Sequence, residues 1–432
     1  MTFSMTQLIA EKRDGRAHSP DQIQEFIRRL SRKELPDYQV AAWLMAAYLN
    51  GLSPEETHAL AVATSQSGRA PDVSGLPRPL IDKHSTGGVG DTVTPLFLPI
   101  VAAMGLTAIK TSGRGLGFTG GTVDKLSAIP GFRIQLSPEE LGDIAREVGC
   151  AVAAQSADLA PADGILYHLR DATETVGSLP LIAASVMGKK LAGGADIILL
   201  DVKSGSGALM KTPEDAAALA NAMLQIGRAS QKKCAAVITD MSQPLGASVG
   251  NALEIRQAIQ DLKLGMQSRL GRLTVELCRI AGRLAGCPVQ PESVVQDGSA
   301  LGKMKEWIAA QGGDARVVDD DALLGAAPVI HVVRARASGF LHEIACSHVG
   351  EVVRSLGGGR KRKEDAIDPL VGVRVHASIG DRIQSGDALF EIHANSDSDA
   401  LRAEEELLTA VHIEDTGCEP PTLIHNVIGL EG

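Results

Sequence analysis

Aromatic side chains are scarce in this sequence of 432 residues, where Phe, Trp and Tyr together make up 3%. The core must therefore depend on Ala, Leu and Val packing and on tight loops, which the 46 glycines can supply. Cysteines are few as well. The six present contain no CxxC pair, and in a chain of this length that pattern favours free, mostly buried thiols in a reducing cytoplasm.

Long hydrophobic runs and an excess of positive charge are also absent. No run approaches the roughly 18 apolar residues that span a bilayer, and residues 1–16 lack the apolar core and cleavage site of a signal peptide. Lys and Arg total 42 against 52 Asp and Glu, which gives a formal net charge of −10. This balance argues against a membrane or nucleic-acid partner, so a site for an anion must be a local exception.

Helix starts are marked by one repeated signal, a Ser or Thr followed by Pro and, three positions on, by an acidic or amide residue. The signal predicts capping boxes at Ser19, Ser53, Ser137 and Thr212, with Pro at the first helical position. The first two fall in residues 1–70, where apolar residues recur at helical spacing. We therefore expect this part of the chain to be helical.

From about residue 71, short apolar runs alternate with Gly-rich turns and helical stretches, which indicates a mostly parallel α/β sheet. The clearest runs are residues 108–110, 197–202 and 235–239. From residue 331 on, β-branched residues and Gly turns predominate, and residues 372–390 resemble a small β-hammerhead. The predicted fold class is α/β, with a helical part before it and a C-terminal α+β domain after it.

The first chemical motif is KHSTGGVGD, residues 83–91. Three glycines in four positions let backbone N–H groups approach an anion, while Lys83, Ser85 and Thr86 add a positive charge and hydroxyl donors. Apolar residues from Leu96 onward predict a following helix, whose amino end favours phosphate. The alternative is a Gly-rich turn without a ligand, because short motifs often occur by chance.

A second Gly-rich motif, SGRGLGFTGGTVDKL, covers residues 112–126 and follows a predicted strand. It contains five glycines and resembles the first motif in its position after a strand. Because parallel strands end at one edge of a sheet, the two loops point to a single crevice outside that edge. This coincidence makes an anion site a better explanation than two unrelated turns.

A third group of polar residues follows in two predicted helices. Ser185 and Lys189 are four residues apart and therefore share one helix face. With Arg170 they could bind the carbonyl and ring N–H edge of a planar pyrimidine. A solvated helix face remains the alternative.

Other polar segments are expected to have structural roles. Residues 201–208, DVKSGSGA, predict a tight turn under the crevice, and residues 357–363, GGGRKRK, predict a mobile, solvated basic loop. The histidines of the C-terminal part, such as His331, His342 and His348, show no metal-ligand spacing.

Together these motifs resemble the pyrimidine and thymidine nucleoside phosphorylases over nearly the whole chain. Anthranilate phosphoribosyltransferase is a more distant relative that shares the fold and a short Gly-rich loop. The resemblance implies a helical lobe and an α/β lobe with a crevice between them, and a homodimer formed through the helical lobe. The implied bounds are residues 1–70, completed by about 163–192, for the helical lobe, 71–162 and 193–330 for the phosphate-binding lobe, and 331–432 for the C-terminal domain.

The resemblance also assigns site residues. Phosphate is expected to contact Lys83, Ser85, Thr94, Lys110, Ser112 and Thr122. The base is expected to contact Arg170, Ser185 and Lys189, and the catalytic set comprises His84, Arg170 and Lys189. Some family members bind potassium, which implies an optional ion at Gly90, Thr92, Leu245, Ser248 and Gln257.

Several positions depart from the family pattern. Phe118 stands where many members have histidine, Ser127 where the motif usually has glutamate, and His168 where a small residue is usual. Gln257 replaces a glutamate of the ion site, which removes a carboxylate charge. Lys110 is typical of members that accept both uridine and thymidine, whereas strict thymidine enzymes tend to have methionine.

The expected reaction is reversible phosphorolysis of uridine, thymidine and deoxyuridine to free base and (deoxy)ribose 1-phosphate. Inorganic phosphate is the co-substrate and no cofactor is required. Phosphate would attack C1′ opposite the base through an oxocarbenium-like transition state, so catalysis would come from positioning and preorganised charge. His84, with an ordinary pKa of about 6.5, could protonate or hydrogen-bond the base oxygen.

Three alternatives remain at this stage. A strict thymidine phosphorylase would cleave only the deoxynucleosides. A phosphoribosyltransferase of the same fold would need acidic magnesium ligands, and a second carboxylate pair is not evident after Lys203. A non-enzymatic nucleoside-binding protein would have lost catalytic groups, whereas Lys83, His84 and Lys189 are all present.

Overall fold

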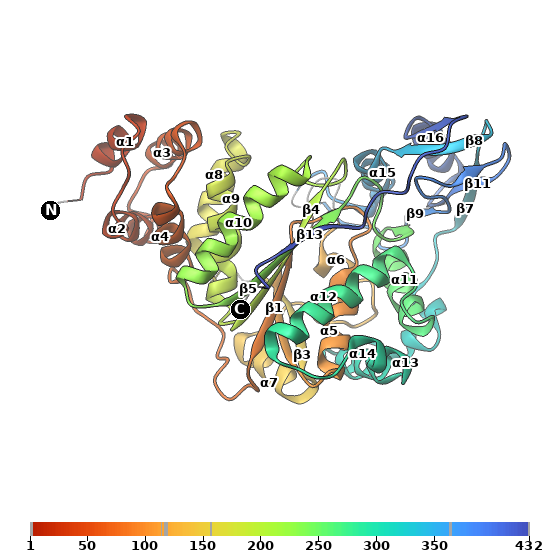
Figure 1. Cartoon of the computed structure of the whole chain (residues 1–432), viewed down its shortest axis with the longest axis horizontal. Coiled ribbons are helices and arrows are strands. Elements are labelled where there is room, and N and C mark those ends of the chain that lie inside the picture. Colours follow the sequence, from red (N-terminus) through yellow and green to blue (C-terminus); the bar gives the residue numbers. More distant parts are fainter. Residues whose placement is uncertain (1–2, 114, 116–119, 156–157, 363–364, 431–432) are drawn as a thin grey trace.

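The computed structural model describes residues 3–113, 115, 120–155, 158–362 and 365–430. Along its long axis lie a group of N-terminal helices, a twisted sheet covered by helices, and a C-terminal domain of smaller sheets (Figure 1). The predicted fold class, a helical part, an α/β part with a mostly parallel sheet and a C-terminal α+β part, is confirmed. Among the described residues, no helix combines the length and apolar character needed to cross a bilayer.

The helical lobe joins two separate parts of the chain. It comprises α1 (Met5–Arg13), α2 (Pro20–Ser31), α3 (Asp37–Asn50), α4 (Pro54–Ser65), α8 (Pro161–Ala172) and α9 (Leu179–Ala192). Helix α4 packs along α9, and both α2 and α3 contact α8. Reciprocal capping boxes start α2 at Ser19 and α4 at Ser53, as predicted.

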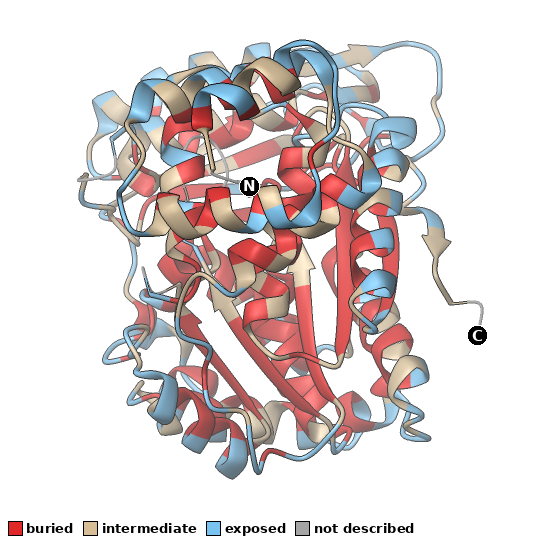
Figure 2. Cartoon of the chain, turned by 90° about the vertical axis from the view of Figure 1, so that its left-hand side faces the viewer, coloured by how far each residue is buried: buried red, intermediate tan, exposed pale blue. Residues whose placement is uncertain are grey.

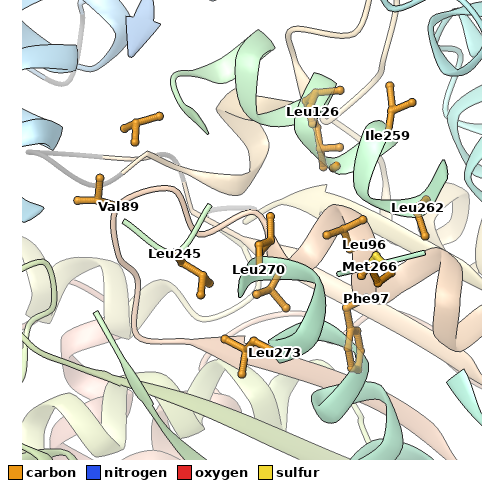
Figure 3. Close-up of a cluster of buried hydrophobic side chains, with 14 of the residues drawn as sticks. Val89, Leu96, Phe97, Leu126, Leu245, Ile259, Leu262, Met266, Leu270 and Leu273 are labelled. Carbon is orange, nitrogen blue, oxygen red and sulfur yellow. The ribbon is translucent and has the colours of Figure 1, made fainter. Parts of the chain in front are cut away.

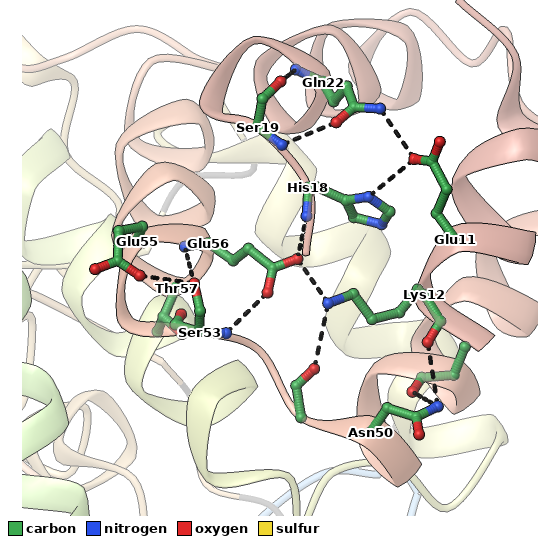
Figure 4. Close-up of polar contacts among 12 residues, drawn as sticks. Glu11, Lys12, His18, Ser19, Gln22, Asn50, Ser53, Glu55, Glu56 and Thr57 are labelled. Atoms are coloured by element: carbon green, nitrogen blue, oxygen red, sulfur yellow. Dashed lines mark hydrogen bonds and ion pairs between the residues drawn. The ribbon is translucent and has the colours of Figure 1, made fainter. Parts of the chain in front are cut away.

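Polar contacts inside this lobe centre on Glu56 (Figure 4). Its carboxylate forms a 2.6 Å ion pair with Lys12 of α1, and both side chains are at most 3% exposed. The same carboxylate accepts the N–H groups of His18 at 2.7 Å and Ser53 at 2.8 Å. One side chain therefore caps α4 and ties α1 and the α1–α2 connection to it.

The main sheet has the strand order β13-β5-β4-β1-β2-β3, and all neighbours except β13 are parallel. Its strands are β1 (Leu80–Ser85), β2 (Thr107–Ser112), β3 (Cys150–Ala154), β4 (Ile197–Ser204), β5 (Lys233–Asp240) and β13 (Ile424–Ile428). The runs predicted at 108–110, 197–202 and 235–239 are thus strands. The order reverses between β1 and β4, and ligands in such sheets bind outside the carboxyl ends at that switch point.

Helices cover both faces of this sheet, so its five parallel strands are buried along most of their length, whereas the edge strand β13 is not (Figure 2). The α/β lobe contains α5 (Val93–Ala103), α6 (Thr122–Leu126), α7 (Pro138–Val148), α10 (Pro213–Ala229), α11 (Asn251–Lys263), α12 (Arg269–Ala285), α13 (Pro291–Gln296), α14 (Ser299–Ala310) and two 3₁₀ turns, Ala315–Val318 and Asp321–Leu324. Alternate residues of β4 belong to two cores. Ile198 and Leu200 pack with the helical lobe, whereas Ile197 and Leu199 pack with α5 and α12.

Two of the four predicted capping signals lie in this lobe. Ser137 starts α7 with a reciprocal capping box, as predicted. At Thr212 the prediction is half right. The hydroxyl accepts the Asp215 N–H, but no bond returns from the Asp215 side chain, which is one methylene shorter than the Glu of a capping box.

The C-terminal domain contains two antiparallel sheets, β6-β9-β11-β7 and β10-β8-β12. Its elements are β6 (Ser248–Val249), β7 (Val329–Arg334), β8 (Gly339–Ile344), α15 (Cys346–Val353), a π-helical turn (Arg354–Gly358), β9 (Gly372–Val375), β10 (Arg382–Ile383), β11 (Ala388–Ala394), α16 (Asp397–Thr409) and β12 (Val411–Glu414). Two strands connect the domains. β6 comes from the α/β region, and β13 returns from the C-terminal region to pair with β5.

Candidate active site

Two adjoining cavities open at the carboxyl edge of the main sheet. The glycine cavity, about 370 Å³, is lined by the loops after β1 and β2. The helix cavity, about 340 Å³, is lined by α8 and α9. Both are lined by His84, Ser85, Thr86, Gly87, Tyr167 and Lys189. The shared lining makes them two compartments of one crevice between the helical and α/β lobes.

The loop after β1 is shaped by its glycines. Gly87 has φ +89°, a backbone conformation that residues with a side chain rarely adopt. A Cβ on Gly88 would lie 2.3 Å from Cε of Met241, so a larger residue there would have to displace the Met241 side chain. Val89, which follows these two glycines, is buried in the core with Leu96 and Leu245 (Figure 3). The loop is therefore held from beneath while its backbone faces the crevice.

Five of the six residues predicted to contact phosphate line the glycine cavity: Ser85, Thr94, Lys110, Ser112 and Thr122. They come from β1, α5, β2 and α6, so the two Gly-rich motifs do meet in one cavity. Lys83 is the exception. Side chains alternate along a strand, so Lys83 lies on the opposite face of β1 from His84. Its Nζ is buried 3.3 Å from Oδ2 of Asp201 on β4.

Buried lysines and carboxylates form a charged cluster beneath the first Gly-rich loop. Lys83 and Lys203 both contact the carboxylate of Asp201, at 3.3 and 2.7 Å, and all three side chains are at most 2% exposed. Burial alone would raise the pKa of Asp91, but Lys203, Lys83 and Lys125 hold it well below its ordinary value. Asp91 is thus ionised and accepts the Ser85 hydroxyl at 2.5 Å.

Lys110 is a buried lysine that also lines the glycine cavity. Its Nζ donates to the carbonyl oxygen of Lys83 at 2.6 Å. Burial and the nearby charge of Lys190 lower the pKa of Lys110 to about 7. Lys190 is itself paired with Asp82 at 3.0 Å. The charge of Lys110 therefore changes around neutral pH.

His84 lies on the wall that the two cavities share. Burial, followed by the charges of Lys190, Lys110 and Lys189, lowers the pKa of His84 well below its ordinary value. The imidazole is therefore neutral near pH 7. It can donate one hydrogen bond to a substrate oxygen, but it is not charged beforehand, as an ordinary pKa of about 6.5 would have allowed.

The predicted base residues Arg170, Ser185 and Lys189 all line the helix cavity. Lys189 Nζ donates to the Ser185 hydroxyl at 3.0 Å and to Oδ2 of Asp163 at 2.6 Å. Arg170 is 3% exposed. Its Nη2 donates to the carbonyl of Val176 at 2.7 Å, so its guanidinium also holds the α8–α9 connection.

Sequence reasoning did not single out Asp163 or Lys203. Asp163 meets Lys189 only because α8 and α9 lie side by side, and nothing in the local sequence of α8 signals that contact. Lys203 lies in the segment predicted as a tight turn, although it belongs to β4 and is fully buried. A lysine that directly follows a run of apolar residues and Asp201 was the available signal.

The residues named for an optional potassium ion lie where the loop after β1 meets β6 and α11: Gly90, Thr92, Leu245, Ser248 and Gln257. Oε1 of Gln257 accepts the Ser248 N–H at 2.8 Å. The Thr92 hydroxyl donates to Glu254, which is also paired with Lys125. Within the described part of the chain, no group of three or more His, Cys, Asp or Glu could hold a metal ion.

Three further positions depart from the family pattern: Phe118, Ser127 and His168. Phe118 lies outside the described residues. Ser127 is exposed at the end of α6, where its hydroxyl donates to the carbonyl of Val123 at 2.7 Å. His168 is exposed on α8 and lines neither cavity. All six cysteines are free, as predicted.

The basic loop was predicted wrongly in one respect. Residues 357–363 were expected to be solvated, and Lys361 and Arg362 are exposed. Arg360, however, is 8% exposed and is paired with Asp124 of α6. Because the partners are 236 positions apart in sequence, no local pattern indicated the contact.

Comparisons with known proteins cover all parts of this architecture. Residues 77–281 match the "Glycosyl transferase family, a/b domain", residues 6–68 its "helical bundle domain", and residues 340–414 the "Pyrimidine nucleoside phosphorylase C-terminal domain". The pyrimidine-nucleoside phosphorylase of Geobacillus stearothermophilus is 43% identical, and that of Bacillus subtilis strain 168 is 41% identical. Each match covers 98% of this chain and 99% of the relative.

A solved structure is similar in fold. The crystal structure of anthranilate phosphoribosyltransferase from Thermus thermophilus superposes with a TM-score of 0.58. The match covers 70% of this chain and 99% of that one, at 20% sequence identity. At that identity the similarity concerns the fold alone.

Proposed function

The chain belongs to the pyrimidine-nucleoside phosphorylase family, and from that premise we propose that it cleaves uridine as well as thymidine and deoxyuridine. Its reaction is the phosphorolysis of pyrimidine nucleosides to free base and a pentose 1-phosphate. The observation that carries the proposal is the shared wall of the two cavities. A ligand among the glycine loops and a ligand against Arg170, Ser185 and Lys189 would meet beside His84.

Phosphate occupies the glycine cavity in this proposal. Thr94, Ser112 and Thr122 offer hydroxyl donors there, whereas the Ser85 hydroxyl already donates to Asp91. Lys83 and Lys203 lie beneath the loop with one carboxylate between them, and Lys110 lines the cavity, so lysines gather here in a chain whose net charge is −10. Lys83 would thus act on phosphate without contacting it, through its positive charge and by holding β1 in place.

The base occupies the helix cavity. Lys189 and Arg170 stabilise the negative charge that grows on the pyrimidine as the bond to C1′ breaks, while Ser185 orients Lys189. Neutral His84 donates a hydrogen bond to the base oxygen. Phosphate attacks C1′ from the opposite face, and no group on the protein becomes covalently attached.

Lys110 is the residue on which the sugar preference depends in this proposal. Its buried Nζ lines the glycine cavity and is held by the carbonyl of Lys83, where it can also reach a 2′-hydroxyl. A hydrogen bond from a charged group contributes about 1.5–3 kcal/mol, which is roughly tenfold or more in rate. The strict thymidine enzyme, the first alternative, lacks that bond.

The test compares uridine with deoxyuridine as substrates for the wild type and for Lys110→Met. We expect the wild type to cleave both, and the variant to lose roughly tenfold more kcat/KM with uridine than with deoxyuridine. Equal losses on both substrates would contradict the role of Lys110 in sugar selection. Wild-type cleavage of deoxynucleosides alone would favour the strict thymidine enzyme. The phosphoribosyltransferase alternative rests on fold similarity alone.

We also propose that the protein is a cytoplasmic homodimer joined through its helical lobe and binds no nucleic acid. Apolar side chains are exposed along one face of α3, with Tyr38 at 74%, Met45 at 39% and Leu49 at 72%. Their spacing of seven and four residues places them in one stripe. An exposed apolar stripe on a surface helix favours burial against a partner, here a second copy.

Potassium is optional in this proposal and takes no part in bond cleavage. The residues expected to bind it fit an ion poorly. The oxygen of Gln257 already accepts a backbone N–H, and the Thr92 hydroxyl is directed to Glu254. The neutral amide also lacks the charge of the carboxylate that it replaces. We therefore expect weak potassium binding and activity in sodium buffers.

A further inference from the structure

We infer that Arg360, a residue of the C-terminal domain, is a positioning residue for the phosphate-binding loop of the α/β lobe. The inference rests on the proposed function of the glycine cavity. Arg360 lines neither cavity of the crevice, so it would act through another residue, Asp124.

The contact between the two domains is short and buried. Nη1 of Arg360 lies 2.9 Å from both carboxylate oxygens of Asp124, and the side chains of Arg360 and Asp124 are 9% and 6% exposed. Oδ2 of Asp124 also accepts the backbone N–H of Gly115 at 2.8 Å. Gly115 lines the glycine cavity. One carboxylate thus connects the C-terminal domain to the backbone of the second Gly-rich motif.

Helix α6 needs such anchors because it is only five residues long. A helix of this length is not stable without contacts from the rest of the fold. Thr122, its first residue, lines the glycine cavity. Lys125 holds α6 on one side through a 2.6 Å pair with Glu254 and a 2.8 Å bond to the carbonyl of Asp91. Asp124 and Arg360 hold it by a second ion pair of opposite polarity.

The segment that carries Arg360 is itself fixed to the α/β lobe. Asn251, at the start of α11, donates from Nδ2 to the carbonyl of Gly358 at 2.9 Å. Gly357 has φ +105°, a turn conformation, and its carbonyl accepts the N–H of Asp368 at 2.9 Å. Arg360 therefore reaches Asp124 from a turn that α11 holds in place, and α11 also carries Glu254.

A buried ion pair by itself adds little to stability, because desolvation offsets the attraction between the charges. Here Nε of Arg360 is buried with no hydrogen-bond partner among the described residues, so the desolvation is not fully compensated. The pair does fix the orientation of Asp124, and with it the Gly115 N–H and Thr122. That geometry is what a loop needs to receive phosphate in one arrangement.

The experiment compares Arg360→Gln with Arg362→Gln in the full-length protein. Arg362 is a matched control because it lies in the same loop, has the same charge and is exposed. With Arg360→Gln we expect KM for phosphate, at saturating uridine, to rise about 10- to 100-fold, while KM for uridine changes less than about twofold. Arg362→Gln should behave as the wild type. A phosphate KM as low as in that control would overturn the inference.

A second variant separates positioning from misfolding. Asp124→Asn should reproduce the loss, and the double variant should lose no more than either single one, because both changes break the same connection. Faster amide hydrogen exchange in residues 110–126, with unchanged exchange in the helical lobe, is expected for each. Unchanged exchange in residues 110–126 of Asp124→Asn would contradict the inference even if Arg360→Gln does not fold.

Failure of the proposed function would give a different result. In that case the wild type would release no base and would bind no inorganic phosphate by titration calorimetry. Failure of the Arg360 inference alone would leave both wild-type properties intact and give Arg360→Gln the phosphate affinity of the wild type.

Discussion

At the scale of single residues, the lysines around the crevice determine the protonation states of their neighbours. His84 is the clearest case, because Lys190, Lys110 and Lys189 add to burial in lowering its pKa. The sequence motif alone suggests the ordinary pKa of about 6.5, and hence an imidazole that is partly charged near pH 7. The surroundings instead favour a neutral hydrogen-bond donor, and this difference can be tested by substitution.

His84→Gln and His84→Phe should differ strongly. Gln keeps a neutral N–H donor, so we expect it to retain kcat within about tenfold of the wild type, whereas Phe removes the donor and should cost about 10²- to 10³-fold. Steady-state kinetics with saturating phosphate measure both. Equal losses in the two variants would instead favour proton transfer by an imidazolium.

Lys110 predicts a pH dependence with a defined sign. Its pKa of about 7 in the folded protein is below the ordinary lysine value, so it is charged below pH 7 and neutral above it. Any contribution of this charge to phosphate binding is present below pH 7 and lost as pH rises. We expect the ratio of kcat/KM between the wild type and Lys110→Met to fall through an inflection near pH 7.

Taking the ratio removes the titration of phosphate itself, which affects both proteins alike. A ratio that stays flat from about pH 5.5 to about pH 9 would show that the charge of Lys110 does not assist phosphate. Since the unfolded chain keeps this lysine charged at higher pH, the same shift makes stability rise with pH above about 7.

At the scale of elements, the helical lobe depends on the buried pair of Lys12 and Glu56. Removing one partner of a buried pair costs about 3–5 kcal/mol, because the other charge stays buried. Glu56→Gln should therefore lower the midpoint of urea denaturation markedly. It should also weaken the hydrogen bonds that the Glu56 carboxylate accepts from the N–H groups of Ser53 and His18.

Glu55→Gln is the control for this prediction. Glu55 is the neighbouring glutamate and is exposed on the same helix. Its replacement should leave the midpoint of urea denaturation nearly unchanged. Similar shifts for the two variants would show that the Glu56 network does not stabilise the lobe.

At the scale of the whole molecule, the exposed stripe of α3 predicts the oligomeric state. If the proposed homodimer forms through this stripe, Leu49→Asp should convert it into a monomer, as measured by light scattering on a sizing column. Leu264→Asp is the matched control, since Leu264 is 74% exposed but lies at the end of α11, away from the helical lobe. Dissociation by both variants, or by neither, would contradict an interface at α3.

The sequence was most informative where one local pattern determines one local structure. The Ser-Pro signals marked helix starts, and the two Gly-rich motifs after β1 and β2 were expected to meet because parallel strands end at one edge. Contacts between distant segments left no such pattern. Asp163 with Lys189, and Arg360 with Asp124, depend on how whole elements pack.

The sequence prediction also did not distinguish the two faces of a strand. Lys83 and His84 are neighbours in the motif, but strand alternation sends Lys83 to Asp201 beneath the sheet edge and His84 to the crevice. The motif identified both residues, and their different roles follow from alternation along β1 together with the pairing of β1 and β4.

The most direct test of the account is base release from uridine, thymidine and cytidine by the purified protein, each with and without inorganic phosphate, followed by absorbance. We predict cleavage of uridine and thymidine that requires phosphate and yields the pentose 1-phosphate. Base release that proceeds equally well without phosphate, or no release from any nucleoside by folded protein, would contradict the central claim that the crevice joins a phosphate site to a pyrimidine site.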